Sequence, residues 1–384
     1  MTTIAFTGGG TGGHIYPGLA VIAKLKEGPA GQRYRIFWIG SQTGMDRAIV
    51  EGAGVEFFGI PAGKLRRYFS LRTVPDALRV GAGFFAARRI LKKQKADLLF
   101  SKGGFVSVPP CAAASSLGIP VFTHESDFSP GLATKLNLRF VRKTGGRVFI
   151  AYPETRKLLP QGVPVAVPMA VPMAMQDQTI VCGNPVRPAF RCADPARGRA
   201  FLGIGPDERI LLVLGGSLGA RQINELVRSA LDALRSHYTV VHQYGRQDWD
   251  LPKMQGYIPL PYINEEMPHV LAAAELVLGR SGAGTVWESA ALGKPMILIP
   301  LSGSGTRGDQ VENAQFFEKE GAALVLTGGD ATAENLSHAV KTIALDSGRR
   351  QALAGAAQRI GSLDGAAIIG DSIDEFIHHT LKGG

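Results

Sequence analysis

The sequence predicts an α/β protein built from two Rossmann-like domains that face each other across a cleft. Three observations lead to this fold class. Short apolar runs alternate with amphipathic helical stretches, glycine-rich turns follow several of the runs, and the whole pattern restarts after Gly183. We therefore expect one domain over residues 1–182 and a second over 183–363, with a last helix at 364–384 that packs back on the first. Such alternation favours parallel sheets with ligands at the carboxyl ends of the strands.

The composition is that of a globular protein in a reducing compartment. The chain has 384 residues, enough for two domains with separate cores, and 45% of them are hydrophobic. Its three cysteines, Cys111, Cys182 and Cys192, form no CxxC pair and cannot all be joined in disulfides, which favours a cytoplasmic setting. The chain enters a strand at once, and no apolar run approaches about 18 residues, so we expect neither export nor a membrane span.

A glycine-rich stretch at residues 8–14 follows the first expected strand and precedes a helix over about 17–26. Its glycines fit the G-x-G-x-x-G pattern of nicotinamide-binding Rossmann domains. In such a domain the next strand, expected here at 35–39, would end in an acid for the adenosine ribose, and residues 40–42 contain none. The glycines are therefore interpreted as admitting a phosphate or a sugar to the backbone.

Two further loops of the first domain place polar residues at strand ends. The apolar run 98–101 leads into a Lys-Gly-Gly stretch, and the run 120–124 leads into Glu125, Ser126 and Asp127. Because the carboxyl ends of parallel strands meet at one edge of a sheet, we expect these loops to lie beside the glycine-rich stretch. His124 ends its strand next to acids that it could bond, so we interpret it as structural or as a neighbour of the site.

The clearest signal of a binding site lies in the second domain. Strands are expected there at 209–214 and 239–243, with a helix over about 222–234 between them. An apolar run ending at Leu278 then breaks into a Gly/Ser turn, and a helix with its cap near Ser281 or Thr285 precedes a strand at 296–300. The start of such a helix presents backbone N–H groups to a phosphate, and Glu288 would accept hydrogen bonds from ribose hydroxyls. The stretch predicts half of a nucleotide pocket.

Two stretches organise the chain without carrying chemistry. The last helix is expected after Asp364 as its cap, and Ile369, Ile373, Phe376, Ile377 and Leu381 recur at helical spacing, so it has an apolar stripe to bury. The repeat at 163–174 has proline at every fourth residue, which forbids a helix and indicates an exposed, extended loop.

Basic residues are concentrated in one part of the chain. The net charge is +10, and residues 63–95 contain ten basic residues, Arg66, Arg67, Arg88 and Arg89 among them, against the single acid Asp76. Large apolar residues, including Phe84 and Phe85, lie between them. A solvated helix face is the plain alternative, but this mixture better fits a surface seated against anionic lipid. Because no nucleic-acid motif accompanies the charge, we expect an anionic membrane surface as a partner and no nucleic acid.

Six motifs of the chain resemble those of the MurG family, in the same order and spacing. They are GGTGGHIYP, HESDFSPGL, GNPVR, GGSLGARQIN, RSGAGTVWE and DQVENA, and the similarity covers nearly the whole chain. The family has the GT-B glycosyltransferase fold. The resemblance implies transfer of N-acetylglucosamine, with inversion, from UDP-N-acetylglucosamine to the 4-hydroxyl of undecaprenyl-pyrophosphoryl-MurNAc-pentapeptide, which converts lipid I to lipid II in peptidoglycan synthesis. It also implies a peripheral protein on the cytoplasmic face of the cell membrane.

The resemblance further implies which residues touch the substrates. They are Thr11, Gly12 and Gly13 for the donor diphosphate and the acceptor, Asp127 for the transferred sugar, Arg187 and Ser217 near the donor phosphates, Ile263 for uracil through its backbone, Ala283, Gly284, Thr285, Val286 and Glu288 for the phosphates and the ribose, and Asp309 and Gln310 for the sugar. Asp127 stands where the family more often has Asn, and Leu218 where it usually has Gln, so this chain departs from the family pattern at two sugar contacts.

The transfer needs a base for the acceptor hydroxyl and a group that stabilises the departing UDP. His14 directly follows the glycine-rich stretch and is the candidate catalytic residue, because imidazole is a suitable base at neutral pH. The alternative is that His14 only holds the loop. The helix near Thr285 and Arg187 would meet the charge on UDP, so we expect no metal and no cofactor. Asp248 and Asp250 spell a D-x-D metal motif, which we reject because so short a motif often occurs by chance.

Other activities are compatible with these patterns. A glycolipid-forming UDP-sugar transferase of the same fold would use the same residues, and a UDP-sugar epimerase would have no use for a lipid-facing basic surface. A non-catalytic subunit that binds a sugar nucleotide or recruits partners to a membrane would need no base at His14.

Overall fold

The structure is a computed structural model of the 384-residue chain. It describes residues 1–27, 34–63, 73–160, 179–216, 219–245, 249, 251–252, 254–303 and 307–381. Some residues singled out in the sequence lie outside the described residues, namely Arg66, Arg67, Ser217, Leu218, the repeat at 163–174, and Asp248 and Asp250.

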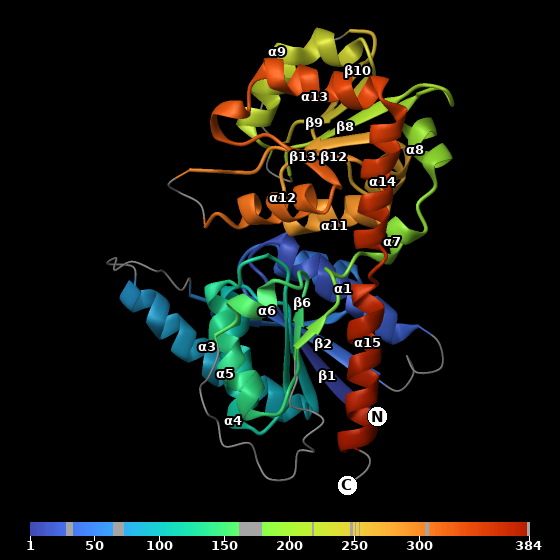
Figure 1. Ribbon diagram of the computed structural model, residues 1–384. Helices are drawn as coiled ribbons and strands as arrows, with labels where there is room; N and C mark the ends of the chain where they lie inside the picture. Colours follow the sequence, from blue (N-terminus) through green and yellow to red (C-terminus); the bar gives the residue numbers. More distant parts are fainter. Residues whose placement is uncertain are drawn as a thin grey trace. The chain divides into compact units, whose positions relative to one another are not determined.

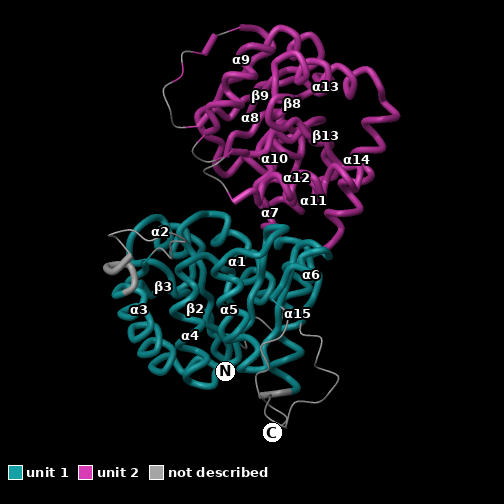
Figure 2. The backbone as a smooth tube through the Cα atoms, turned by 60° about the vertical axis from the view of Figure 1, so that its left-hand side comes forward, with its two compact units in different colours: residues 1–185, 364–384 teal, residues 186–363 magenta. Residues whose placement is uncertain are grey.

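The chain divides into two compact units (Figure 2). Unit 1 comprises Met1–Pro185 together with Asp364–Gly384, and unit 2 comprises Val186–Leu363. Unit 1 is therefore assembled from both ends of the chain, and unit 2 from the segment between them. Each unit has a parallel sheet and an apolar core of its own.

Unit 1 contains a seven-stranded sheet whose strands all pair in parallel (Figure 1). In spatial order they are β3 (Glu56–Ile60), β2 (Tyr34–Ser41), β1 (Thr2–Thr7), β4 (Leu98–Ser101), β5 (Val121–Glu125), β6 (Val148–Ile150) and β7 (Thr179–Val181). The sequence of the strands reverses direction between β1 and β4. In open α/β sheets this reversal marks the place where ligands bind, at the carboxyl ends of the two strands.

Helices cover both faces of this sheet because its strands are apolar on both sides. Along β1, Ile4 and Phe6 belong to one buried cluster and Ala5 to another. The first cluster is completed by α1 (Gly12–Lys26), α2 (Asp46–Gly52) and α15 (Gly365–Phe376). The second is completed by α3 (Thr73–Gln94), α4 (Val108–Ser116) and α5 (Leu132–Lys143). The short elements η2 (Phe105–Ser107), α6 (Thr155–Leu158) and η5 (Ile377–Leu381) complete the unit.

The last helix of the chain belongs to the core of unit 1. Asp364 caps α15 by accepting a hydrogen bond from the Ala367 N–H at 3.1 Å. Its apolar stripe, which includes Ile369, Ile373 and Phe376, is buried in the same cluster as β1. Polar contacts fix it from the side, since Arg147 donates hydrogen bonds to the Ser372 hydroxyl and pairs with Glu375.

Unit 2 contains a six-stranded parallel sheet with the same kind of reversal, here between β8 and β11. In spatial order its strands are β10 (Tyr257–Leu260), β9 (Thr239–Gln243), β8 (Ile210–Leu214), β11 (Leu276–Gly279), β12 (Met296–Leu298) and β13 (Ala323–Val325). Its helices are α7 (Pro188–Arg191), α8 (Pro195–Leu202), α9 (Arg221–Arg235), α10 (Met267–Ala273), α11 (Ala283–Ala291), α12 (Asp309–Lys319), α13 (Ala333–Leu345) and α14 (Ser347–Gly361), with the turn η4 (Gly328–Asp330). Among the helices of the described residues, none has the length and apolar character needed to span a bilayer.

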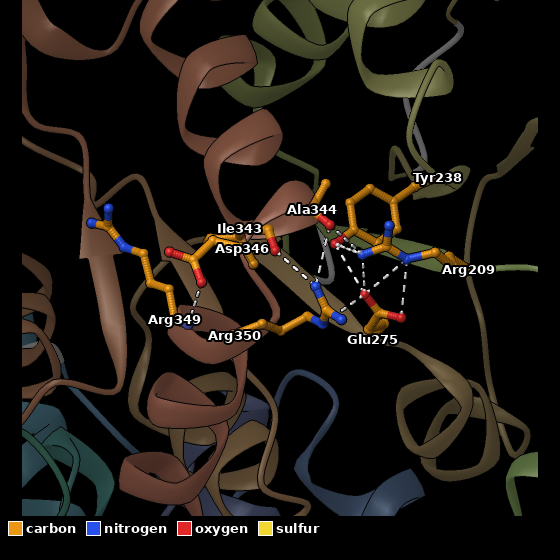
Figure 3. Close-up of polar contacts among 8 residues, drawn as sticks. All are labelled: Arg209, Tyr238, Glu275, Ile343, Ala344, Asp346, Arg349 and Arg350. Atoms are coloured by element: carbon orange, nitrogen blue, oxygen red, sulfur yellow. Dashed lines mark hydrogen bonds and ion pairs between the residues drawn. The ribbon is translucent and has the colours of Figure 1, made fainter.

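A charged cluster ties the amino ends of β8 and β11 to two helices of unit 2 (Figure 3). The Glu275 carboxylate accepts hydrogen bonds from Arg209 Nε at 3.0 Å and from the Tyr238 hydroxyl at 3.1 Å, and Arg350 Nε lies 3.1 Å away. Both arginines also donate to the carbonyl of Ala344 near the end of α13. Burial alone would raise the pKa of Glu275, but the hydrogen bonds and positive charge of the arginines outweigh it and hold that pKa below its usual value.

Replacing Glu275 with Gln should destabilise unit 2, because two arginines then lose their shared carboxylate. We expect a loss of about 1.5–3 kcal/mol in the free energy of unfolding, as for hydrogen bonds to charged groups. The matched control is Glu225→Gln, which breaks an exposed pair with Arg221 and should cost at most about 1 kcal/mol. Thermal unfolding at neutral pH measures both variants.

The pH dependence of this effect has a definite sign. The folded-state pKa of Glu275 is lowered, so its contribution to stability is present above the unfolded pKa of about 4.3 and is lost as the pH falls through the folded value. The difference between the wild type and Glu275→Gln should therefore shrink in acid. A difference that stayed constant into strong acid would contradict this account.

Candidate active site

In unit 1, the loop between β1 and α1 is held by a buried carboxylate. Asp46, at the start of α2, accepts hydrogen bonds from the Gly10 N–H at 3.1 Å and from the Ser41 N–H at 3.0 Å. A Cβ atom at Gly9 would overlap this carboxylate. At Gly10, where φ is +88°, a Cβ atom would lie 2.7 Å from the Phe105 ring. Only glycine lets the backbone come this close.

Asp46, which holds this loop, was not singled out in the sequence. An acid for an adenosine ribose was considered only directly after the second strand, where there is none, whereas Asp46 lies in the first turn of the following helix. An acid at a helix start is a weak signal on its own, because it also suits the helix dipole. Its partner Gly10 is 36 residues away in the chain, and only the fold brings the two together.

His14 lies in the first turn of α1, because the helix starts at Gly12 and not near residue 17 as expected. Thr11 is the N-cap residue, and the His14 N–H donates to its carbonyl at 3.1 Å. The half-buried imidazole lies against the loop that follows β4, since a Cβ atom built on Gly104 would be 2.9 Å from His14 Cδ2. Thr11 and Gly13 are exposed and Gly12 is half-buried. The candidate base thus lies where the strand order reverses.

The loop after β5 is organised by Glu125. Its buried carboxylate accepts hydrogen bonds from the N–H groups of Ser126 at 2.9 Å, Asp127 at 3.0 Å and Gly131 at 2.9 Å. Asp127, which is half-buried, is thereby fixed at the same edge of the sheet as the glycine-rich loop. His124 bonds the carbonyl of Gly183 through Nε2 at 2.9 Å, so its observed partner is a backbone group and not the acids that follow it.

In unit 2, the turn between β11 and α11 is tied to the start of α12. The expected side-chain cap at Ser281 or Thr285 is wrong: the N-cap residue is Gly282, and no side chain caps the helix. Ser281 is buried, and its hydroxyl donates to the Gln310 carbonyl at 2.6 Å. Asn313 in turn donates to the Ser281 carbonyl at 3.1 Å. This leaves the first N–H groups of α11 without a side-chain cap, as an anion-binding helix start requires.

The residues predicted around α11 divide by exposure. Ala283, Gly284 and Thr285 are half-buried, whereas the Val286 side chain is fully buried and can offer a ligand only its backbone. Glu288 is paired with Arg187, whose Nε and Nη2 lie 3.1 and 3.0 Å from Glu288 Oε1. Burial raises the pKa of Glu288, and the guanidinium opposes that shift. Two predicted residues 101 positions apart in the chain are therefore in direct contact.

Three other residues predicted to bind the sugar nucleotide lie elsewhere in unit 2: Ile263 is in the loop after β10, and Asp309 and Gln310 begin α12. The Ile263 N–H donates to the side-chain oxygen of Gln243, at the end of β9, at 2.9 Å. Gln310 accepts from the Leu301 N–H at 3.0 Å through its side-chain oxygen, which fixes its carboxamide. Asp309 pairs with Arg307 at 2.7 Å. Gln243 was not singled out in the sequence, because the residues around the end of a strand do not indicate a contact with Ile263, 20 positions later.

Within the described part of the basic stretch, residues 73–94 form α3, whose outer face carries both charge and apolar area. Leu78 and Phe85 are 71% and 70% exposed, and Arg88 and Arg89 are exposed beside them. Phe84 is half-buried and packs on the apolar core of unit 1, with its ring 5.2 Å from that of Phe85. The structure describes four of the predicted lipid-facing residues. Phe85, Arg88 and Arg89 lie on the surface, and Phe84 anchors the helix to the core.

Comparison with known proteins assigns the family. Residues 4–146 match the glycosyltransferase family 28 N-terminal domain, and residues 210–367 match the C-terminal domain of that family. A protein from Treponema denticola, named UDP-N-acetylglucosamine–N-acetylmuramyl-(pentapeptide) pyrophosphoryl-undecaprenol N-acetylglucosamine transferase, is 48% identical over 86% of this chain and 85% of its own length. A protein of the same name from Lachnospira eligens is 41% identical over 90% of this chain and 92% of its own. The chain belongs to the MurG family.

Solved structures agree with this assignment. The crystal structure of Acinetobacter baumannii MurG matches with a TM-score of 0.71 at 25% identity, over 98% of this chain and all of that one. The crystal structure named putative UDP-N-acetylglucosamine 2-epimerase from Listeria monocytogenes matches with a TM-score of 0.68 at 14% identity, over 100% of this chain and 97% of that one, and shows the fold alone. The two parallel-sheet units are those of a GT-B glycosyltransferase, and this MurG-family chain is an enzyme of that class.

An alanine at Gly104 should impair activity more than stability. Its Cβ atom would lie 2.8 Å from the Gly9 carbonyl oxygen and 2.9 Å from the His14 ring, so both must move. Gly118 is the matched control, because φ is +72° there and +76° at Gly104, but nothing lies within 4 Å of the added atom. Gly118→Ala carries the strain of a positive φ, about 1–2 kcal/mol, whereas Gly104 has a ψ of +158° and lies in a region almost restricted to glycine, so Gly104→Ala is strained by about 1–3 kcal/mol. We expect only Gly104→Ala to lose about 10-fold or more in glycosyltransferase turnover. Equal turnover in the two variants would show that the placement of His14 and Gly9 does not matter.

Proposed function

We propose that this protein transfers N-acetylglucosamine from UDP-N-acetylglucosamine to undecaprenyl-pyrophosphoryl-MurNAc-pentapeptide in peptidoglycan synthesis. The names of its relatives support this, since the Treponema denticola protein is 48% identical to it. The observation that carries the proposal is the Arg187–Glu288 pair beside the uncapped start of α11. A carboxylate and a free helix start at one sheet edge are the groups that a nucleoside diphosphate needs.

In this proposal unit 2 binds the donor. The N–H groups of Ala283–Val286 receive the diphosphate, and Glu288 accepts hydrogen bonds from the ribose hydroxyls. Because both Arg187 nitrogens converge on Oε1 of Glu288, they hold that oxygen in place. The backbone of Ile263 borders the uracil, with Ser217 near the phosphates and Gln310 and Asp309 at the sugar.

Unit 1 in this proposal binds the acceptor, and His14 acts as the base. The acceptor 4-hydroxyl oxygen attacks the anomeric carbon, its proton passes to the imidazole, and the bond from that carbon to the diphosphate breaks with inversion. The electron pair leaves with UDP, and its charge is met by the start of α11 and by Arg187. Thr11, Gly12 and Gly13 border the acceptor and the donor diphosphate, and Asp127 approaches the transferred sugar.

We also propose that α3 seats the enzyme on the cytoplasmic face of the membrane, where the lipid-linked acceptor lies. Exposed Phe85 and Leu78 supply apolar area for the interface, and Arg88 and Arg89 supply positive charge toward anionic headgroups. A solvated helix face would use the arginines equally well but gives no reason for the exposed apolar residues.

Product analysis tests the proposed reaction. The purified protein is offered a panel of UDP-sugars with a lipid-pyrophosphate acceptor, and we expect N-acetylglucosamine to be transferred. His14→Ala should lower kcat by about 100-fold or more while donor binding is kept, since a base contributes in the transition state. Glu288→Gln should weaken donor binding by about 10- to 100-fold, because it removes a charged acceptor. Full turnover by His14→Ala would point to a protein that only binds sugar nucleotides, and transfer of another sugar would point to a different glycolipid synthase.

Flotation with vesicles tests the membrane proposal. Changing Arg66, Arg67, Arg88 and Arg89 to Gln should lower binding to phosphatidylglycerol-containing vesicles by about 100-fold or more, at about 1 kcal/mol for each charge. The control removes four exposed arginines from α9 and α14 of unit 2, namely Arg221, Arg228, Arg349 and Arg359. We expect the control to bind as the wild type does. Equal losses in the two variants would mean that net charge alone drives binding and that α3 is not special.

A further inference from the structure

A lysine lies buried beneath the ligand loops of unit 1. Lys102 directly follows β4, at the reversal of strand order, and is 1% exposed. Its N–H donates to the carbonyl of Thr7 at 2.8 Å, and its Cβ lies 3.2 Å from the position that a Cβ atom on Gly8 would take. The side chain therefore runs directly under the glycine-rich loop. Its ammonium donates a hydrogen bond to the Ser126 hydroxyl, in the loop after β5.

The charge of this ammonium is balanced by the acids of that same loop. Burial lowers the pKa of Lys102 to about 8. Glu125 and Asp127 attract the ammonium and oppose that shift. A buried ammonium without such partners costs several kcal/mol. Glu125 is already fixed by three backbone N–H groups, so the position of the loop and the charge of Lys102 depend on each other.

The other titratable groups around Lys102 do not supply this balance. Burial and the charge of Lys102 hold the pKa of His124 well below its usual value, so that imidazole is neutral. Burial raises the pKa of the Cys182 thiol, which therefore stays protonated. His14, on α1, lies against the backbone of Gly103 and Gly104, next to Lys102 in the chain. Glu125 and Asp127 are thus the negative groups that face the ammonium.

We propose that Lys102 is a positioning residue for the transfer, and that its protonated form holds Ser126 and Asp127 in the orientation that the transferred sugar requires. This inference rests on the proposed function. Glu125 anchors the loop through the backbone, and Lys102 anchors it through the Ser126 side chain and through charge. Without the ammonium, two carboxylates two residues apart would face a neutral interior and repel each other.

The inference gives turnover an alkaline limb. As the pH rises through about 8, Lys102 loses its proton, the loop loses its counter-charge, and kcat falls. His14 as a base works in the opposite sense, because its neutral form is the active one. Stability should also move in the opposite sense: the pKa of Lys102 is about 8 in the folded protein and about 10.4 in the unfolded chain, so its contribution to stability rises with pH between these values. If kcat falls with pH while the contribution of Lys102 to stability rises, Lys102 positions the loop for the transfer and does not merely stabilise the fold.

The experiment compares four variants in the complete enzyme. Lys102→Met removes the charge and keeps an unbranched stem, and Lys102→Met/Asp127→Asn removes one charge of each sign. Asp127→Asn alone measures the cost of changing the proposed sugar contact. Lys294→Met is the matched control, because the pKa of Lys294 is also lowered to about 8 by burial, and its ammonium donates to the Ala272 carbonyl in unit 2. Donor KM, acceptor KM, kcat and thermal unfolding are measured from about pH 6 to about pH 9.5.

We expect Lys102→Met to lower kcat by about 10- to 100-fold with donor KM unchanged, and the double variant to lose no more kcat than Asp127→Asn loses alone. The alkaline limb near pH 8 should be present in the wild type and in Lys294→Met and absent from the double variant. A double variant that is no better than Lys102→Met, or that keeps the limb, overturns the inference. If Lys102→Met fails to fold, the limb in the other four proteins decides. A wild type that transfers no N-acetylglucosamine contradicts the proposed function instead, and this inference falls with it.

Discussion

The close approach of bare backbones at the reversal of strand order is the constraint on which the sites of both units depend. In unit 1 the loop after β1 meets Asp46 and the loop after β4. In unit 2, Gly279 at the end of β11 comes so close to β8 that a Cβ atom there would lie 2.7 Å from the Leu214 carbonyl oxygen. Glycine permits such contact but carries a cost in chain entropy. Buried side-chain acceptors and donors offset that cost by fixing the loops, so N–H groups stay available for a ligand.

The two ends of the unit 2 sheet use charge for different purposes. At the amino ends of β8 and β11, Glu275 binds two arginines that also hold a helix terminus, so the charges satisfy one another. Beyond the carboxyl end of β11, Arg187 donates from two nitrogens to one oxygen of Glu288 and holds that oxygen in place. Sheet polarity explains the difference, since ligands meet parallel sheets at the carboxyl ends of strands.

Local patterns predicted the elements well and their partners poorly. Apolar runs and glycine punctuation placed β4 at its observed bounds, because they reflect burial and turn geometry, which the neighbouring residues decide. The start of α1 was missed because Pro17 suggested a first turn, and Ser281 was taken for a cap although its hydroxyl bonds Gln310. The roles of Asp46, Gln243 and Lys102 depend on residues that are 20 to 36 positions away in the chain, and no local pattern encodes such contacts. The family resemblance indicated which residues contact the substrates. It did not indicate the side chains that fix those residues in place, such as Asp46 and Gln243.

The return of the last helix to unit 1 has a consequence for biosynthesis. Unit 1 is split between Met1–Pro185 and Asp364–Gly384, and the late segment supplies Ile369, Ile373 and Phe376 to its core. A ribosome therefore finishes every residue of unit 2 before it finishes unit 1. The middle of the chain can complete its folding first, while the apolar surface that awaits α15 stays uncovered until that helix has been made. Nascent chains that stall before α15 would expose that surface, so the synthesis of this helix is the step that completes the core of unit 1.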